Sequence, residues 1–138
     1  MLVVDASVLV GILLKEPGLE EAEQALIAKS DAISPAGFPN EVVNGLRSAV
    51  LRRRIDFDQA LAAAAAADEL GIGIVTEEPA SIATLLAKAR DWGLTPYDCA
   101  YVDLALAKGA TLLTRDGDMR AAAERLGVKV LPSAPRSV

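Results

Sequence analysis

The chain has 138 residues, which suits one domain, and 52% of them are hydrophobic while 4% are aromatic. This balance favours packed helices and short apolar strands over a β-sandwich, and the formal net charge of −5 argues against the whole surface being a nucleic-acid platform. Histidine is absent and Cys99 is the one cysteine, which excludes serine–histidine and cysteine–histidine hydrolases and an intrachain disulfide framework, and makes the reducing cytoplasm the expected compartment.

The first elements alternate between strand and helix. Met1–Val4 is a short apolar strand, and Asp5 separates it from a helix over Ala6–Leu14. This segment lacks the basic start of a signal peptide, and it is shorter than the roughly 20 apolar residues of a membrane helix. Pro17-Gly18 then breaks the chain before a second helix over Glu20–Lys29.

The alternation continues to the end of the chain. The remaining expected elements are, in order, a strand at Ala32–Ile33, a helix from between Pro35 and Asn40 to about Arg53, a helix over Phe57–Leu70, a strand at Ile72–Val75, a helix over Ser81–Trp92, a helix from Thr95-Pro96 to Lys108, a strand at Thr111–Leu113, a helix from Asp116 to Leu126, and a strand at Val128–Leu131. Residues 1–132 are thus one expected domain, and residues 133–138 are an expected frayed tail.

Helical periodicity also predicts buried faces. In the second helix the expected apolar face consists of Ala22, Ala25 and Leu26. In the helix ending at Lys108, the i, i+3, i+4 and i+7 positions are Tyr97, Ala100, Tyr101 and Leu104.

Alternating strands and helices predict an α/β fold with a parallel sheet covered on both faces and connected by right-handed crossovers. In such sheets, ligands bind beyond the carboxyl ends of the strands, where the strand order reverses. Any acidic residue that directly follows a strand is therefore a candidate for a functional site.

Four acids fit that position or lie near it. Asp5 follows the first strand, Asp116 follows the Thr111–Leu113 strand, Asp98 lies in the first turn of the helix after Thr95, and Glu41 lies on an early turn of its helix. Taken singly, the three aspartates fit helix capping or first-turn acids, and Glu41 fits a solvated surface residue. Both interpretations stay open at this stage.

Together, the four acids indicate metal chemistry. Crowded carboxylates repel one another unless protons or cations neutralise them, and oxygen ligands suit Mg²⁺ and Mn²⁺. A bound ion of this kind can activate water and stabilise the leaving oxygen in phosphodiester cleavage, without any histidine.

Four segments resemble the motifs of PIN-domain ribonucleases, in family order and over nearly the whole chain. They are Val3-Val4-Asp5-Ala6-Ser7, Asn40-Glu41-Val42-Val43-Asn44-Gly45-Leu46, Tyr97-Asp98-Cys99-Ala100-Tyr101 and Leu112-Leu113-Thr114-Arg115-Asp116.

The resemblance implies a three-layer α/β/α domain with a parallel sheet of order 3-2-1-4-5. At this length it points to a VapC-like toxin of a type II toxin–antitoxin system. Such toxins are homodimeric, Mg²⁺- or Mn²⁺-dependent endoribonucleases silenced by an antitoxin protein. The implied catalytic residues are Asp5, Glu41, Asp98 and Asp116, with Asp5, Asp98 and Asp116 as the main metal ligands and Glu41 and Asp118 as further ones.

Several neighbouring residues have two interpretations. Asp118 could serve a second metal ion or the start of its helix. Ser7 and Thr114 could orient a ligand, a water or the scissile phosphate, or could cap the backbone locally. Arg115 could contact phosphate because it adjoins the fourth acid. The run Arg52–Arg54 could contact RNA or antitoxin, although cations also stabilise a helix C-terminus.

Two other functions compete with a nuclease. A non-catalytic PIN-fold binding module would be marked by loss of an acid, and none is lost here. A phospho-acceptor or phosphatase on a similar sheet would need a second aspartate two residues after Asp5, where Ser7 stands, or, for a receiver domain, an acidic pair and a later lysine that Thr114-Arg115 does not supply.

Overall fold

The computed structural model describes residues 1–16 and 21–132. In these residues one or two helices follow each strand but the last. In chain order the elements are β1 (Leu2–Val4), α1 (Ala6–Leu13), α2 (Glu21–Lys29), β2 (Ala32–Pro35), α3 (Phe38–Leu51), α4 (Phe57–Glu69), β3 (Gly73–Val75), α5 (Ile82–Trp92), α6 (Pro96–Lys108), β4 (Thr111–Leu113), α7 (Gly117–Arg125) and β5 (Val130–Leu131).

The strands form one parallel sheet in the order β3-β2-β1-β4-β5. The central strand β1 pairs through Val3 with Ile33 of β2 and with Leu112 of β4. All three residues of β1 are buried, as expected for a strand covered on both faces. The α/β class and the 3-2-1-4-5 order predicted from the sequence are confirmed.

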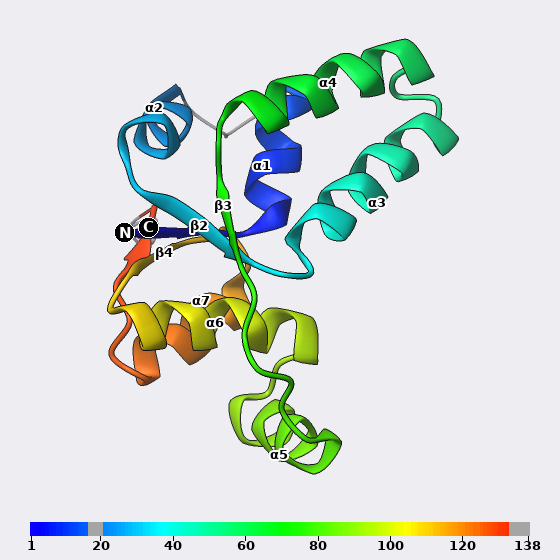
Figure 1. The fold of residues 1–138 in the computed structure, drawn as a ribbon. Coiled ribbons are helices and arrows are strands. Elements are labelled where there is room, and N and C mark those ends of the chain that lie inside the picture. The colour runs from blue at the N-terminus through cyan, green and yellow to red at the C-terminus, as the bar shows by residue number, and fades with distance from the viewer. Residues whose placement is uncertain (17–20, 133–138) are drawn as a thin grey trace, which may run out of the picture.

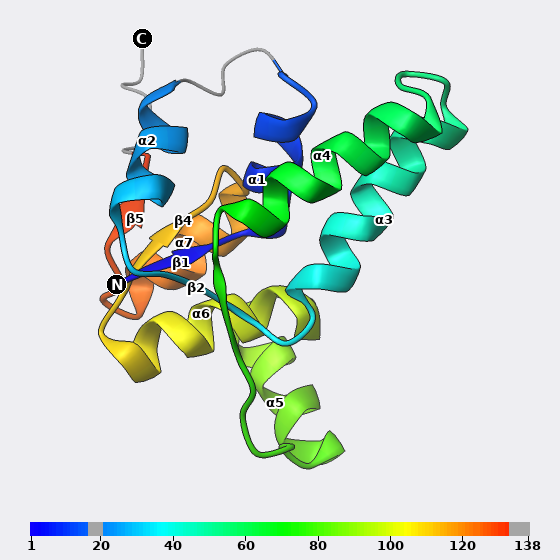
Figure 2. The same ribbon diagram turned by 45° about the horizontal axis from the view of Figure 1, so that its top comes forward.

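Helices cover the sheet in two layers (Figures 1 and 2). Helices α1 to α4 lie on one face and α5 to α7 on the other. This division follows from right-handed crossovers, because the chain moves outward from β1 to β3 and then returns to β4 and β5. The order therefore reverses between β1 and β4, so the loops after these two strands open into the same crevice.

Local sequence signals fix most helix ends. Asp56 and Gln59 form a capping box at the start of α4. Thr95 caps α6, and Pro96 occupies its first turn. Helix α6 ends at Gly109, whose φ of 59° is left-handed and favours a residue without a side chain. The predicted boundaries of these helices hold to within a residue or so.

Two predictions about buried faces are wrong. Tyr97 is 70% exposed, because it lies in the first turn of α6, beyond the carboxyl edge of the sheet. In α2, Ala22 and Ala25 are exposed, whereas Glu23 and Ile27 are buried. Helix α2 is turned this way because the Glu23 carboxylate pairs with an arginine of another element, described below.

Some predictions fall outside the described residues: the break at Pro17-Gly18, the start of a helix at Glu20, and the tail at residues 133–138. Within the described part of the chain, no helix has the length and apolarity needed to cross a bilayer.

Candidate functional site

The four acids identified in the sequence line one cleft of about 440 Å³ at the carboxyl edge of the sheet. They come from four separate places in the chain: the end of β1, the first turn of α3, the first turn of α6 and the loop after β4. The cleft walls contain Asp5, Glu41, Asp98 and Asp116 together with Ser7, Val10, Glu16, Asn44 and Gly45. The topology thus brings together carboxylates that are far apart in the sequence, the most distant pair being Asp5 and Asp116, 111 positions apart.

Asp5 lies at the base of the cleft and is only 5% exposed. It is the N-cap of α1, and its Oδ1 accepts a hydrogen bond from the Ser7 backbone N–H at 3.3 Å. Its Oδ2 accepts two more, from the Ser7 hydroxyl at 2.7 Å and from the Thr114 hydroxyl at 2.8 Å. These donors fix the orientation of the carboxylate.

Thr114 connects the first and fourth acids. Its hydroxyl, which donates to Asp5, also accepts a hydrogen bond from the backbone N–H of Asp116 at 3.1 Å. Asp116 in turn caps α7, because its Oδ1 accepts from the Met119 backbone N–H at 2.8 Å. Thr114 is fully buried, so this chain of hydrogen bonds holds the two acids in a fixed relation.

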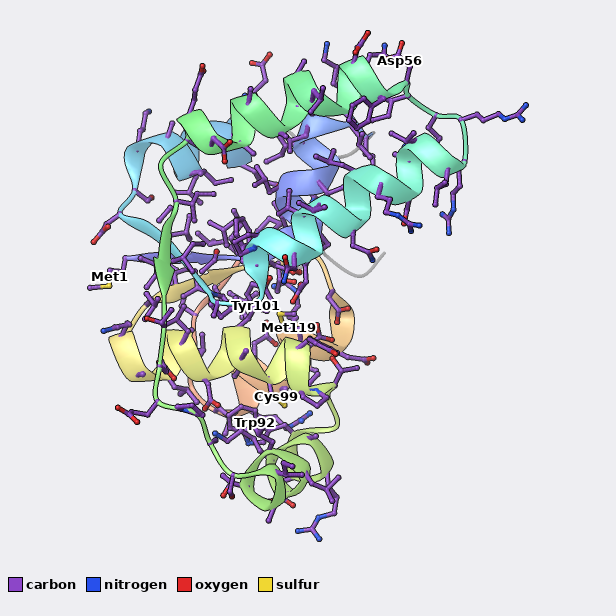
Figure 3. All side chains as sticks on the ribbon, turned by 45° about the vertical axis from the view of Figure 1, so that its right-hand side comes forward. Met1, Asp56, Trp92, Cys99, Tyr101 and Met119 are labelled. Atoms are coloured by element: carbon purple, nitrogen blue, oxygen red, sulfur yellow. The ribbon has the colours of Figure 1, made fainter. Side chains whose placement is uncertain are left out.

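Glu41 enters the cleft from the first turn of α3. Its Oε2 accepts a hydrogen bond from the Tyr101 hydroxyl at 3.0 Å (Figure 3, where Tyr101 is labelled). The pKa of Glu41 is raised above its ordinary value, chiefly by burial and further by the charges of Asp5 and Asp98, although the tyrosine bond opposes the shift. The pKa of Tyr101 is also raised, first by burial and then by the Glu41 and Asp5 charges, so its hydroxyl stays a proton donor.

Asp98 faces the other acids from the first turn of α6. Its pKa is raised by burial first, and then by the negative charges of Asp116, Asp5 and Asp118, while a hydrogen bond with Thr95 acts in the opposite direction. Three neighbouring carboxylates therefore add to the effect of burial, as is typical of a cluster of anionic side chains.

The remaining residues named from the sequence have different surroundings. Ser7 lines the cleft and Thr114 supports it, as described above, whereas Asp118 lies in the first turn of α7 and acts on Asp98 through its charge. Arg115 forms an ion pair with the buried Glu23 of α2, in which its Nε and Nη2 groups donate to the two carboxylate oxygens. In this structure its guanidinium is therefore engaged within the protein.

Sequence reasoning missed three contributors to the cleft. Tyr101 is buried, as its helical periodicity predicted, but its hydroxyl also holds Glu41, which the periodicity did not indicate. Asn44 lines the cleft, and its spacing of three residues from Glu41, on one helical face, was the signal available. Glu16 also lines the cleft, but it follows the end of α1, where no periodic pattern could have placed it.

The donor set fits a hard divalent cation. Four carboxylates border one polar cleft, and two of them, Glu41 and Asp98, have pKa values raised first by burial and then by the neighbouring carboxylates. Among residues 1–16 and 21–132, no three acidic or thiol side chains lie close enough to form a ready-made metal cage. Asp5 and Asp116 are turned toward hydroxyl and backbone donors instead, so binding would draw the carboxylates toward the ion.

One solved structure has the same fold as this chain. The structure of PAE2754 from Pyrobaculum aerophilum is similar to this chain with a TM-score of 0.72 and 22% identity, over 95% of this chain and 83% of that one. A domain of a protein of unknown function from Methanocaldococcus jannaschii aligns over 99% of this chain and 94% of its own, with a TM-score of 0.49 and 18% identity. No curated protein matches the sequence. The model of the PIN domain matches residues 2–125, and the chain therefore belongs to the PIN domain family.

Proposed function

We propose that this protein is a divalent-metal-dependent endoribonuclease that acts as the toxin of a toxin–antitoxin pair. The PIN domain is in general a nuclease fold, and its nucleases generally use divalent metal ions. The observation that carries the proposal is the convergence of Asp5, Glu41, Asp98 and Asp116 on one cleft from four separate elements.

In this proposal Asp5, Asp98 and Asp116 hold Mg²⁺ or Mn²⁺, with Glu41 as a further ligand. When bound, such an ion lowers the pKa of water and offsets charge on the reacting phosphate and the leaving oxygen. Hydrolysis adds water across the P–O3′ bond, so the products carry a 5′-phosphate and a 3′-hydroxyl.

The other residues of the site support the acids. Ser7 and Thr114 hold the Asp5 carboxylate through the hydroxyl bonds described above. Tyr101 keeps Glu41 directed into the cleft from the opposite face of the sheet. These hydrogen bonds restrict the Asp5 and Glu41 side chains before RNA arrives, so that binding of an ion requires the carboxylates to turn toward it from a held position.

RNA cleavage with defined metal ions tests the proposal. We expect cleavage with Mg²⁺ or Mn²⁺, none with EDTA, and a loss of at least about 100-fold in rate for Asp5→Asn and for Asp98→Asn. Asp31→Asn is the matched control, because it makes the same chemical change at an exposed position before β2, outside the cleft. Undiminished cleavage in either cleft variant refutes the assignment.

Metal binding separates the nuclease from the non-catalytic binding module. Calorimetry on the wild-type protein should show uptake of Mn²⁺, and Asp5→Asn should abolish it. A wild-type protein that binds neither Mn²⁺ nor Mg²⁺ would favour a module that keeps the fold and uses its surface for a partner.

A second copy of the chain and an antitoxin are the protein partners that we propose. Helix α5 supports a protein interface, because none of its residues is buried and its Ile82 and Leu86 are 86% and 70% exposed. Large apolar side chains exposed together mark interaction surfaces. Sedimentation of wild type and Leu86→Ser tests the homodimer, since the variant should shift the protein toward monomer.

A further inference from the structure

Helices α1 and α3 end side by side, away from the four acids. The side chain of Glu16, just after α1, pairs with Arg54, just after α3, at 3.4 Å. Together with Lys15, Arg52 and Arg53, Arg54 forms a basic surface that we call the arginine rim. Figure 3 shows the α3–α4 turn, which carries residues 52–54, beside the labelled Asp56 and at the opposite end of α3 from the labelled Tyr101, and Figure 2 shows the same turn projecting from the body.

The backbone of the rim is strained in two places. Lys15 and Arg53 have φ angles of 55° and 59°, in the left-handed region where a side chain is unfavourable. Helices α5 and α6 end instead on Gly93 and Gly109, at φ angles of 67° and 59°. A cation at a helix C-terminus interacts favourably with the helix dipole, but glycine would remove the strain. Strained positions of this kind cluster where a side chain is needed for function.

The rim continues the acid cleft. Glu16 lines that cleft and also contacts Arg54, so the basic surface begins where the acidic one ends. Arg52 and Arg53 are exposed, and neither has an ion-pair partner within the described part of the chain. A protein with a net charge of −5 therefore presents a local concentration of available cations next to its candidate site.

An aromatic side chain adjoins these cations. Phe57 is 65% exposed, and with Arg53 and Arg54 it lines a shallow hollow of about 550 Å³. Asp56 also borders the hollow, but its carboxylate accepts the backbone N–H of Gln59. Arginines that track phosphates beside an exposed ring on which a base can stack are the elements of single-strand recognition.

We propose that the arginine rim binds the phosphodiester backbone of single-stranded RNA on one side of the scissile bond. The inference rests on the proposed ribonuclease function and assigns its substrate a direction, along α1 and α3 from the acids to the rim. From Glu41 to Arg52 the helix rises about 16 Å, at roughly 1.5 Å per residue. That distance corresponds to about five stacked nucleotides, at roughly 3.4 Å each.

Steady-state cleavage by Arg52→Gln/Arg53→Gln tests the surface, with Arg90→Gln as a control that removes one exposed arginine on α5. With an RNA of about 12 nucleotides the double variant should raise KM about three- to tenfold at unchanged kcat, and should reduce the salt dependence of binding, log K against log salt, by about 1.4, or roughly 0.7 per phosphate contact. An RNA of about four nucleotides spans only about 14 Å and should be cleaved equally by variant and wild type.

Substitution by glycine separates RNA binding from a structural role. Because Arg53→Gly relieves the backbone, it should raise Tm by about 2–4 °C and yet raise KM for the longer RNA. Arg53→Lys should keep the wild-type KM, since it keeps the charge. A glycine variant with a higher Tm and an unchanged KM would show that the rim only terminates the helices, and would overturn the proposal.

Three further outcomes also overturn it. If the rim variants leave RNA kinetics equal to those of Arg90→Gln but weaken binding to a protein partner or a second copy, the surface contacts protein. If wild type neither binds nor cleaves RNA with Mg²⁺ or Mn²⁺, the ribonuclease function itself fails. Wild-type cleavage with no effect of the rim variants refutes the RNA path alone.

Discussion

Replacing Asp98 by asparagine should make the metal-free protein more stable and the metal-bound protein less stable. Asparagine has nearly the same shape, so the substitution removes one charge from the cleft. The pKa of Asp98 is raised by burial and by three neighbouring carboxylates, which means that the folded protein holds this proton more tightly than the unfolded chain does. At pH 7 both states are ionised, and the ionised Asp98 therefore weakens the fold.

The size of the effect follows from the exposure of the group. One pKa unit corresponds to about 1.4 kcal/mol, but Asp98 is only partly buried, so solvent screening reduces its contribution to about 0.5–1 kcal/mol. For 138 residues that corresponds to an increase of about 2–3 °C in Tm. The gain should develop as the pH rises above the ordinary pKa of 3.8, and disappear below it, where wild type is protonated as well.

Metal should reverse the order of stability. A cation at about 100 times its Kd stabilises the wild-type fold by about 2.7 kcal/mol, which exceeds the repulsion that it neutralises, whereas the variant lacks one ligand and gains less. Thermal denaturation at pH 7, in EDTA and in Mn²⁺, measures both arms, with Asp31→Asn as the control that should show no reversal. The reasoning is refuted if Asp98→Asn is less stable than wild type in EDTA, or if Mn²⁺ leaves the wild-type Tm unchanged.

Three further substitutions test the support of the site. Tyr101→Phe removes the hydroxyl that donates to Glu41. It should lower the free energy of unfolding in urea by about 1–2 kcal/mol and weaken Mn²⁺ binding measured by calorimetry. Equal Mn²⁺ affinity would show that Glu41 needs no such restraint. Thr114→Val keeps the shape of the side chain but breaks the hydrogen-bonded link between Asp5 and Asp116. It should lower the free energy of unfolding by about 1–3 kcal/mol and lower kcat. An unchanged kcat would show that the carboxylates act independently of this hydroxyl. Gly45→Ala would bring a Cβ within 2.8 Å of a Val10 methyl group. We therefore expect the free energy of unfolding to fall by about 1–2 kcal/mol, although alanine has the better helix propensity. The double variant with Val10→Ala should recover this stability, and no recovery would show that the strain lies elsewhere.

The sequence was sufficient for the fold because its signals agree at every level. Strand β1 is a short apolar run closed by Asp5, and helix α6 has a cap at Thr95 and a stop at Gly109. Alternation of such elements leaves few topologies once right-handed crossovers are imposed, and the order 3-2-1-4-5 among them was what the resemblance to PIN-domain ribonucleases implied. The errors arose where tertiary contacts override periodicity: α2 buries Glu23, because Arg115, distant in sequence, supplies its counter-charge.

The candidate site was predictable only in part. Strand-end position and motif selected the four acids, but neither shows how a side chain is held. The hydrogen bond from Tyr101 to Glu41 joins residues 60 positions apart and crosses from α6 to α3, so no local pattern records it. The same is true of Glu16, whose place in the cleft depends on where α1 ends relative to α3.

Capping and metal binding do not compete in this fold. Helices α1, α3, α6 and α7 all direct their N-termini at the cleft, and each carries an acid as its N-cap or in its first turn. The partial positive charge of four helix ends stabilises four carboxylates that would otherwise repel one another, and each carboxylate keeps acceptor sites that its cap does not use. The backbone therefore assembles the anionic cluster before any cation binds, although neighbouring carboxylates still add to the effect of burial in raising the pKa values of Glu41 and Asp98. That remaining repulsion is what a divalent ion would relieve, and it makes metal affinity a property of the helix arrangement as much as of the four side chains.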